Sequence, residues 1–523
     1  MPLAYDQLPN DAESLKRLVL GKQELIARLT DEIARLKRWR FGRSSEVMDA
    51  AMPQQDLPLG DVLEVPPTAA NDSHPAPQSE AILRQDSARE SSKDTSTKLR
   101  RTARVFPAHL PREIVMHAPA ACDCPECGGS MRKLGEDVSE MLNYLPGTFT
   151  VIRHVRPKLS CVRCSKVIQL PAPSRPIERG MPAAGLLAQV IVSKYADHCP
   201  LYRQQAIYRR SGIDLDRATL AAWVGQVSDR LDPLVVALGR YVRSAEKLHT
   251  DDTPVPVLEP GRGKTRTGRW WTYVRDDRPA GSAAPPAVWY RFSPDRRGEH
   301  PQAHLKDFRG ILQADGYAGY GPIYATGRVL EAACWAHARR HYYDLYAINK
   351  SPTAAEAIRR IGLLYAVERD IRGQLPEIRR QIRQQRSATI LEELHAWLSA
   401  TLQAVSAKSP LAGAIKYTLV RWTALTRFVD DGRIELDNNT AERSIRALVI
   451  GRRNYLFAGS DDGGERAANL YSLIGTALLN TVEPYAYLRH VIEHIADHPN
   501  RRIDELLPWH VAPLLAPALC QAA

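Results

Sequence analysis

Long hydrophobic runs are missing from this sequence of 523 residues, and their absence restricts where the protein can act. A membrane-spanning helix needs about 18 or more consecutive apolar residues, but the most apolar run, residues 183–192, is soon followed by Lys194. The segment Met1–Lys16 is acidic and contains no apolar signal core. We therefore expect a cytoplasmic protein that does not contact a membrane.

Cysteine is scarce as well, with eight residues in the whole chain. In a long cytosolic protein, so few cysteines favour metal binding or burial over disulfides. Four of them form two CxxC pairs, Cys124 with Cys127 and Cys161 with Cys164, and the alternating residues between the pairs predict short strands. Two such pairs offer four thiolates to a tetrahedral Zn²⁺ ion and leave no open position. We predict a structural zinc site in a zinc-ribbon, DNA-binding domain over residues 106–180; the alternative is a set of buried cysteines without metal.

Aromatic residues are absent from residues 51–98, where Pro, Ser, Asp and Ala predominate. That composition cannot bury enough apolar surface to fold, so we predict a disordered linker over residues 47–105. Before the linker, leucines recur at heptad spacing between Leu15 and Leu36. This spacing predicts a leucine-zipper-like helix over residues 1–46. The helix either pairs copies of the chain as a coiled coil or packs on its own domain as one amphipathic helix.

Negative charge is in deficit, because 71 Lys and Arg residues face 59 Asp and Glu residues and give a net charge of +12. A polyanionic partner such as DNA fits this excess, which many soluble proteins also share. Residues 181–240 read as three helices, at 183–195, 202–210 and 216–230, with a glycine-containing turn before the third. This order is the DNA-binding helix-turn-helix pattern and is also common in small helical bundles. The candidate DNA contacts are Arg203, Arg209, Arg210 and Arg217.

Residues 241–351 follow an order of strands and helices that is typical of a ribonuclease-H-like α/β core. Strands are predicted at 247–258, 269–275 and 287–292, with a basic turn at 261–268. A helix at 298–308, strands at 310–315 and 329–334 and a helix at 335–345 complete this part. In that fold the first and fourth strands are neighbours, so Asp251 and Asp315 would meet at the strand ends.

Residues 352–430 interrupt the core with continuous helical patterns and are predicted to form a helical insertion. The core resumes at 431–462, where Asp437 or Asn438 caps a helix whose first turns carry Glu442. Residues 463–523 form a helical C-terminal domain. The chain as a whole is predicted to be a multidomain α+β protein.

Asp251, Asp315 and Glu442 are candidates for metal ligands because of where they lie, two near the ends of apolar strands and one at a helix start. Ionised carboxylates in such places need a metal, a cation or water. Oxygen ligands suit Mg²⁺ or Mn²⁺, and two such ions about 3.5–4 Å apart promote in-line phosphoryl displacement. Arg443 and Arg446 beside the glutamate are suited to hold the transferred phosphate.

Four segments, LHTDDTPVPVL, LQADGYAGY, CWAHARR and LDNNTAERSIR, together resemble the DDE transposases of the insertion-sequence sixty-six family. The two CxxC pairs, the N-terminal leucines and the tail after residue 458 resemble that family too. The resemblance implies that Asp251, Asp315 and Glu442 are the catalytic residues and hold two Mg²⁺ or Mn²⁺ ions. The family commonly has Glu at the place of Asp252. Neighbours on a strand face opposite sides, so only one of the two adjacent aspartates binds metal, and the motif favours Asp251.

The resemblance further implies a transposase of a bacterial insertion sequence, which binds terminal inverted repeats, cleaves the DNA ends and joins them to target DNA. Such a protein is expected at the nucleoid, as a homodimer or higher oligomer, with small accessory proteins of the same element as further partners. Cys334 and His337 form a CxxH pair that is either functional near the acids or simply packed at the sheet edge. Two alternatives remain: a DNA-binding repressor that no longer cuts, and a ribonuclease-H-like nuclease.

Overall fold

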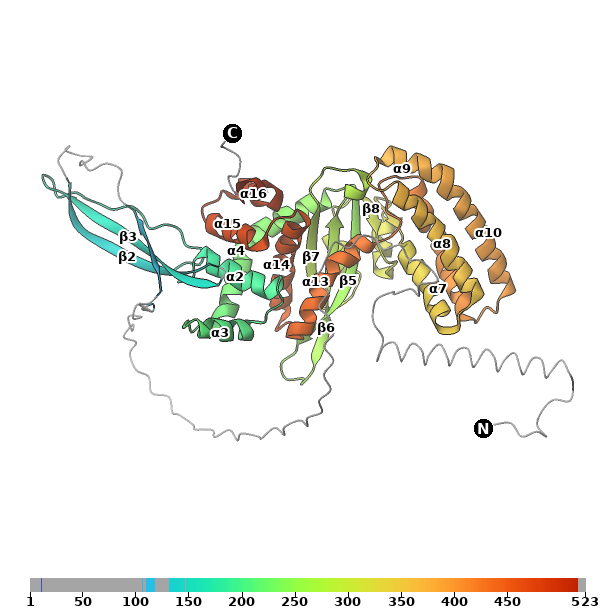
Figure 1. Ribbon diagram of the computed structural model, residues 1–523, viewed down its shortest axis with the longest axis horizontal. Coiled ribbons are helices and arrows are strands. Elements are labelled where there is room, and N and C mark those ends of the chain that lie inside the picture. Colours follow the sequence, from blue (N-terminus) through green and yellow to red (C-terminus); the bar gives the residue numbers. More distant parts are fainter. Residues whose placement is uncertain (1–10, 12–105, 107–109, 118–130, 146, 516–523) are drawn as a thin grey trace, which may run out of the picture. The chain divides into compact units, whose positions relative to one another are not determined.

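The computed structural model describes residues 11, 106, 110–117, 131–145 and 147–515 (Figure 1). The predicted leucine-zipper-like helix (except for Asp11), the predicted linker, Cys124 and Cys127 lie outside the described residues. Within the described ranges, no helix is both long and apolar enough to cross a membrane. These residues form two β-sheets and a series of helices, so the chain has mixed α and β structure.

The first sheet is built on a long hairpin. Strands β2 (Met131–Leu145) and β3 (Thr148–Cys161) pair antiparallel from end to end, and β1 (Arg112–Met116) and β4 (Val167–Ile168) both pair with β3. Gly147 at the tip has a φ of 84°, a conformation that glycine adopts without strain. The prediction of short strands between the cysteine pairs was therefore wrong, because the period-two alternation continues through both arms of one hairpin.

Three helices follow the hairpin: α2 (Ala184–Tyr195), α3 (Leu201–Arg210) and α4 (Arg217–Arg243). Asp216 caps α4 as predicted and accepts a hydrogen bond of 2.7 Å from the amide of Thr219. The predicted end of this helix at residue 230 was wrong. Helix α4 continues through Pro233 because its apolar face continues, with Leu231, Leu234 and Leu238 all buried.

The second sheet has the strand order β7-β6-β5-β8-β9. Its strands are β5 (Lys247–Leu258), β6 (Thr265–Arg275), β7 (Ala287–Ser293), β8 (Gly310–Gln313) and β9 (Val329–Ala332). The pairs β5–β6 and β6–β7 are antiparallel, whereas β8 is parallel to both β5 and β9. All five strands were predicted, but β8 and β9 each end two residues earlier than expected and β6 begins earlier. The predicted turn at 261–268 is shorter, because Thr265–Gly268 pair with the end of β5.

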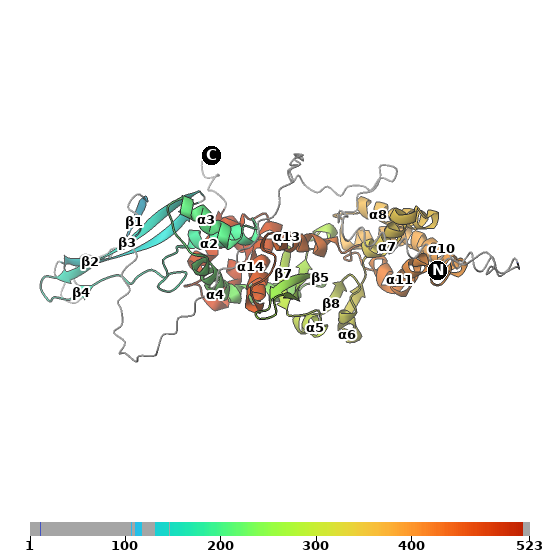
Figure 2. The same cartoon turned by 90° about the horizontal axis from the view of Figure 1, so that it is seen from below.

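Helices cover both faces of this sheet, and two adjacent tryptophans on β6 show which face is which (Figure 2). The indole Nε1 of Trp270 donates to the carbonyl of Gly464 on α14 (Asp461–Leu479) at 3.0 Å. Trp271 points the other way and packs against Tyr317 and Tyr320, beside α6 (Gly321–Ala325). Helix α13 (Asn439–Tyr455) lies on the same face as α14, while α5 (Glu299–His304) lies on the face of Trp271.

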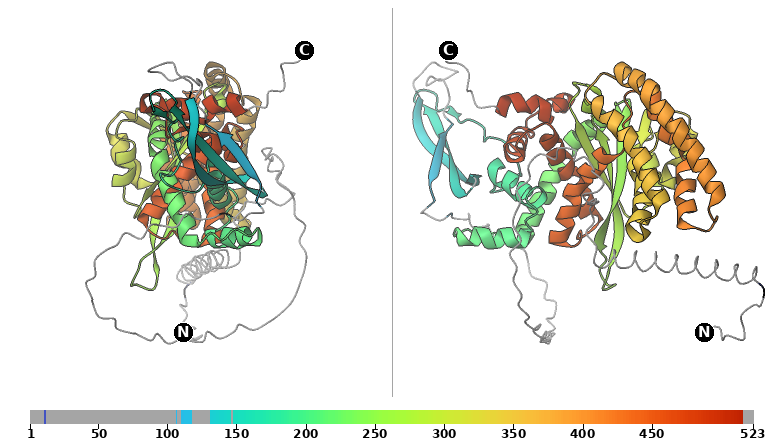
Figure 3. Two further views of the ribbon diagram at one scale, coloured as in Figure 1. Left: turned by 90° about the vertical axis from the view of Figure 1, so that its left-hand side faces the viewer. Right: turned by 45° about the vertical axis from the view of Figure 1, so that its right-hand side comes forward.

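A group of helices follows the sheet (Figure 3), and its buried apolar residues form one hydrophobic core with Ile311 of β8 and Ala332 of β9. Its helices are α7 (Trp335–Asn349), α8 (Pro352–Asp370), α9 (Pro376–Ile382), α10 (Ala388–Ala404), α11 (Pro410–Val420) and α12 (Trp422–Thr426). The fully buried Trp335, Leu364, Leu394 and Ile415 belong to this core. Two more helices, α15 (Pro484–His494) and α16 (Pro508–Leu515), follow α14, and α15 packs against α2.

Candidate active site

Two adjacent aspartates at the middle of β5 point to opposite faces of the sheet. Asp251 pairs across to Thr272 and Asp252 pairs across to Trp271, in an uninterrupted register. Asp252 faces the side of Trp271, where its carboxylate receives hydrogen bonds from Arg269 at 2.8 Å and from Arg296 at 2.8 Å. With a side chain only 2% exposed, Asp252 is a buried carboxylate whose charge is already balanced by two arginines.

Asp251 has an environment of the opposite kind. Its Oδ1 accepts a hydrogen bond of 2.7 Å from the amide of Asp252. Burial raises the pKa of Asp251 to about 8, and the negative charges of Asp315 and Glu442 contribute to the rise. The structure thus brings the three acids from distant parts of the sequence close enough for their charges to interact.

Asp315 is placed beside Asp251 by the parallel pairing of β5 with β8. His249 of β5 pairs with Gln313 of β8. Asp251 and Asp315 each follow two residues later, and because the two strands are parallel, the two aspartates lie side by side. The Oδ1 of Asp315 accepts a hydrogen bond of 3.0 Å from the amide of Tyr317, which orients the carboxylate. Arg296 lies 3.9 Å from its Oδ2.

Glu442 is positioned by Asn438, a fully buried residue directly before α13. The Asn438 Nδ2 donates to the carbonyl of Thr250 at 2.9 Å, so its Oδ1 is left as the acceptor for Nδ1–H of His249 at 3.1 Å. Its backbone amide donates to the Cys334 sulfur at 3.1 Å. Sequence reasoning treated Asn438 only as a helix cap and missed this role, because its partners come from two other segments.

His249 is fully buried, and burial lowers its pKa to about 3, which keeps the imidazole neutral. Its place in the core, facing Asn438, fits a positioning role better than contact with a substrate.

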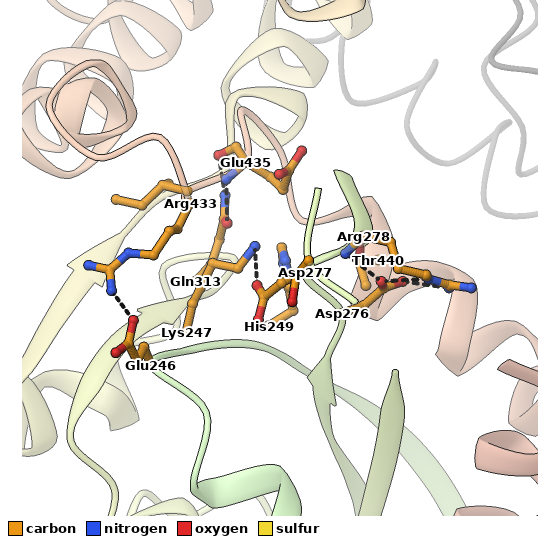
Figure 4. Close-up of polar contacts among 12 residues, drawn as sticks. Glu246, Lys247, His249, Asp276, Asp277, Arg278, Gln313, Arg433, Glu435 and Thr440 are labelled. Atoms are coloured by element: carbon orange, nitrogen blue, oxygen red, sulfur yellow. Dashed lines mark hydrogen bonds and ion pairs between the residues drawn. The ribbon is translucent and has the colours of Figure 1, made fainter. Parts of the chain in front are cut away.

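The chain that returns from the helical segment is fixed to β8 just before α13 (Figure 4). The side chain of Gln313 donates to the carbonyl of Glu435 at 2.6 Å, and its oxygen accepts the Glu435 amide at 3.3 Å. Burial alone would raise the pKa of Glu435, but the cations Lys247 and Arg379 lower it to about 2. Lys247 is itself buried and lies 3.2 Å from Asp277. This polar layer fixes the starting point of α13 relative to the sheet.

The remaining predicted residues of this region lie around Glu442. Arg443 and Arg446 are exposed on α13, and Arg443 donates to the Thr440 hydroxyl at 3.2 Å. Cys334 precedes α7 and is buried, and burial raises the pKa of its thiol. His337, on the first turn of α7, has its Nδ1 3.9 Å from a carboxylate oxygen of Glu442. The CxxH pair therefore follows the edge strand β9 and also lies beside Glu442.

The second cysteine pair lies at the end of the hairpin in a tight turn. The Cys161 amide donates to the Lys166 carbonyl at 2.9 Å, and the Ser165 amide donates to the Cys161 carbonyl at 3.0 Å. Ser165, directly after Cys164, has a φ of 57°, and glycine follows the first pair in the sequence. A turn that folds the chain back around two cysteines fits a metal knuckle, although half of the predicted ligands lie outside the described residues.

The predicted DNA-contacting arginines lie on two consecutive helices. Arg203, Arg209 and Arg210 are exposed on α3, and Arg217 is exposed at the start of α4. Arg209 pairs with Asp214 at 3.1 Å in the intervening turn. The turn and the exposed basic side chains agree with a helix-turn-helix-like arrangement.

A mixed sheet flanked by helices, with Asp251 and Asp315 on neighbouring parallel strands and Glu442 on a helix packed against β5, is consistent with a nucleic-acid-processing protein. Comparison with known families is specific: the model "Transposase IS66 family" matches residues 179–466. The chain belongs to the IS66 family of transposases. The IS66 C-terminal element matches residues 472–509, and the zinc-finger binding domain of transposase IS66 matches residues 121–165. A further model, "Transposase C of IS166 homeodomain", matches residues 28–115.

Similar proteins extend over nearly the whole chain. "Uncharacterized protein y4jD" of Sinorhizobium fredii (strain NBRC 101917 / NGR234) is 39% identical over 520 residues, which cover 98% of each chain. "Uncharacterized protein y4hP" of the same strain is 40% identical over 92% of this chain and 88% of its own length. DNA is accordingly the partner that the family's domains imply.

Proposed function

We propose that the chain is a DDE transposase that cleaves and joins DNA ends with the carboxylates of Asp251, Asp315 and Glu442. The observation that carries the proposal is the parallel pairing of β5 with β8, which places Asp315 beside Asp251. Burial raises the pKa of Asp251 to about 8, and the negative charges of Asp315 and Glu442 add to the rise. Carboxylates whose charges act on one another in this way are stabilised when cations bind between them.

The donor set also fits the kind of ion. Carboxylate oxygens suit hard divalent ions such as Mg²⁺ or Mn²⁺, and the different environments of the adjacent aspartates favour Asp251 as the ligand. Two such ions, when bound, supply activation of the attacking oxygen and stabilisation of the leaving oxygen. Asn438 holds the glutamate-bearing helix against β5. Arg443 and Arg446, exposed beside Glu442, are available to orient the scissile phosphate by charge-assisted hydrogen bonds.

The remaining domains supply DNA recognition in this proposal. The order of the central sheet, with three antiparallel strands followed by two parallel ones, supports a ribonuclease-H-like core. The exposed arginines of α3 and α4 and a Zn²⁺-bearing knuckle, with Cys124, Cys127, Cys161 and Cys164 as ligands, would bind the terminal inverted repeats. The N-terminal heptads would pair subunits, so that two DNA ends are held in one complex at the nucleoid. Small proteins of the same element are proposed as further partners.

Strand transfer of a labelled terminal repeat in Mn²⁺ tests the proposal. Asp251→Asn, Asp315→Asn and Glu442→Gln are each expected to reduce both end cleavage and joining by at least about 10³-fold, since each removes a charged ligand from the reaction centre. Asp307→Asn is the matched control, because Asp307 is exposed shortly before β8 and belongs to no cluster of acids. Its activity should equal that of the wild type.

Other outcomes would replace the proposal. A wild type that binds the repeats but neither cuts nor joins would point to a repressor. Cutting of RNA–DNA hybrids without joining would point to a nuclease. Full activity of Asp315→Asn would remove the central carboxylate cluster from the reaction altogether.

A further inference from the structure

Three residues of different chemistry meet beside the carboxylate cluster. Cys334 follows β9, His337 lies on the first turn of α7, and Glu442 lies on α13. One ligand atom from each of them lies within 4.8 Å of the others. Ligand atoms around a tetrahedral ion with bonds of about 2.0–2.3 Å are about 3.3–3.8 Å apart. A small rotation of these side chains would bring the three ligand atoms from within 4.8 Å of one another to the separation that an ion requires.

The imidazole of His337 is poorly explained by hydrogen bonding. Its Nδ1 is buried and has no hydrogen-bond partner among the described residues. The closest carboxylate oxygen, on Glu442, is 3.9 Å away, which is too far for a hydrogen bond. A buried ring nitrogen normally has a partner. A metal ion between the two would bind both the His337 Nδ1 and the Glu442 carboxylate, which are too far apart to hydrogen-bond to each other.

The sulfur of Cys334 is held in place by backbone hydrogen bonds. It accepts a backbone hydrogen bond from Asn438 at 3.1 Å and a second backbone hydrogen bond from His337. It also sits at the N-cap position of α7, where the helix dipole favours negative charge. Two N–H donors to one sulfur are more than a packed thiol needs, because a neutral sulfur is a weak acceptor.

We propose that Cys334, His337 and Glu442 form a binding site for a transition-metal ion of the Zn²⁺ type, separate from the cysteine knuckle. Thiolate and imidazole donors select this class over Mg²⁺, which prefers oxygen alone. Binding releases the thiol proton to solvent. The side chains of His337 and Glu442 are 31% and 43% exposed, so an ion can enter, and three protein ligands leave a fourth position open.

The inference rests on the proposed function in one respect only, which is that Glu442 belongs to both groups of ligands. A carboxylate that binds a Zn²⁺-type ion beside Cys334 has less freedom to serve ions near Asp251. The two ideas can fail separately. Zinc content reports the new site without any DNA cutting, and Asp315→Asn is expected to stop cutting while the zinc content stays that of the wild type.

Zinc per chain, measured by mass spectrometry of the full-length protein after loading with ZnCl₂ and removal of loosely bound metal, tests the site. The variants Cys334→Ala and His337→Ala are each expected to hold one ion fewer than the wild type. Cys199→Ala is the matched control, because its partly buried thiol lies outside both groups of ligands, and it should hold as many ions as the wild type. Cys164→Ser should lose the knuckle ion and keep the other. An unchanged zinc content in both Cys334→Ala and His337→Ala would overturn the proposal.

Cobalt spectroscopy gives a second readout that does not depend on counting, and it covers the case in which Cys334→Ala folds poorly. With Co²⁺ as the probe, we subtract the absorption spectrum of His337→Ala from that of the wild type. The difference should contain visible bands and a sulfur-to-metal charge-transfer band of one thiolate. The partly exposed His337 can be replaced without opening the core. A flat difference spectrum, or full displacement of the ion by equimolar Mg²⁺, would show that no site of this kind exists.

Discussion

Replacement of Asn438 by alanine tests how the glutamate-bearing helix is held in place. The substitution removes the donor to the Thr250 carbonyl and the acceptor for the His249 ring. The Nε2 of His249 already has no hydrogen-bond partner within the described residues, so neither ring nitrogen would then be bonded there. Each buried polar group left without a partner costs about 1–3 kcal/mol. We expect the free energy for opening α13 away from β5 to fall by about 3 kcal/mol in total.

Amide hydrogen exchange of α13 measures this opening directly. A loss of about 3 kcal/mol corresponds to roughly a hundredfold faster exchange across residues 439–455. Asn439→Ala is the matched control. The side chain of Asn439 is half-buried and donates to Asp437 at 2.9 Å, and its loss should change the exchange less than about tenfold. Equal exchange in wild type and Asn438→Ala would refute the idea that this amide anchors the helix.

Three further substitutions test other parts of the structure. Glu435→Gln should lower the free energy of unfolding at neutral pH. The pKa of Glu435 is about 2 in the folded protein and about 4.5 in the unfolded chain, so the difference in stability from wild type should shrink as the pH falls from 4.5 toward 2. Gly310→Ala should reduce soluble, folded protein, since φ is 136° and an added Cβ would overlap the carbonyl oxygen of Glu246. Arg383→Met should lower the urea midpoint by an amount equivalent to about 3–5 kcal/mol, because it breaks a buried pair with Glu368 at 2.6 Å; an unchanged midpoint would contradict this.

Most of the central sheet was predictable because β7, β8 and β9 are short and largely apolar, and β5 is rich in Thr, Val and Leu, which favour strands. The start of β6 was not, since Thr265–Gly268 are largely polar and pair with the exposed end of β5. The length of α4 was underestimated because of a proline inside the helix. Pro233 reads as a helix end, but tertiary packing of the apolar face outweighs its cost.

The closeness of Asp251 and Asp315 followed from the expected strand order, but the environments of the individual acids did not. Apart from the family motif, nothing local distinguishes Asp251 from Asp252 in the sequence. The difference arises from Arg269 and Arg296, which approach only one face of the sheet and come from two other segments. The buried role of Asn438 depends in the same way on the folded arrangement, which a single segment does not encode.

The helical segment after the sheet lies between the strand of Asp315 and the helix of Glu442, and the chain must cross it to complete the acidic cluster. The only covalent route to Glu442 from the earlier strands therefore runs through helices whose hydrophobic interior also includes Ile311 of β8 and Ala332 of β9. Substitutions that destabilise this interior, for example at the fully buried Leu394, should consequently reduce cutting at elevated temperature without touching any of the three acids.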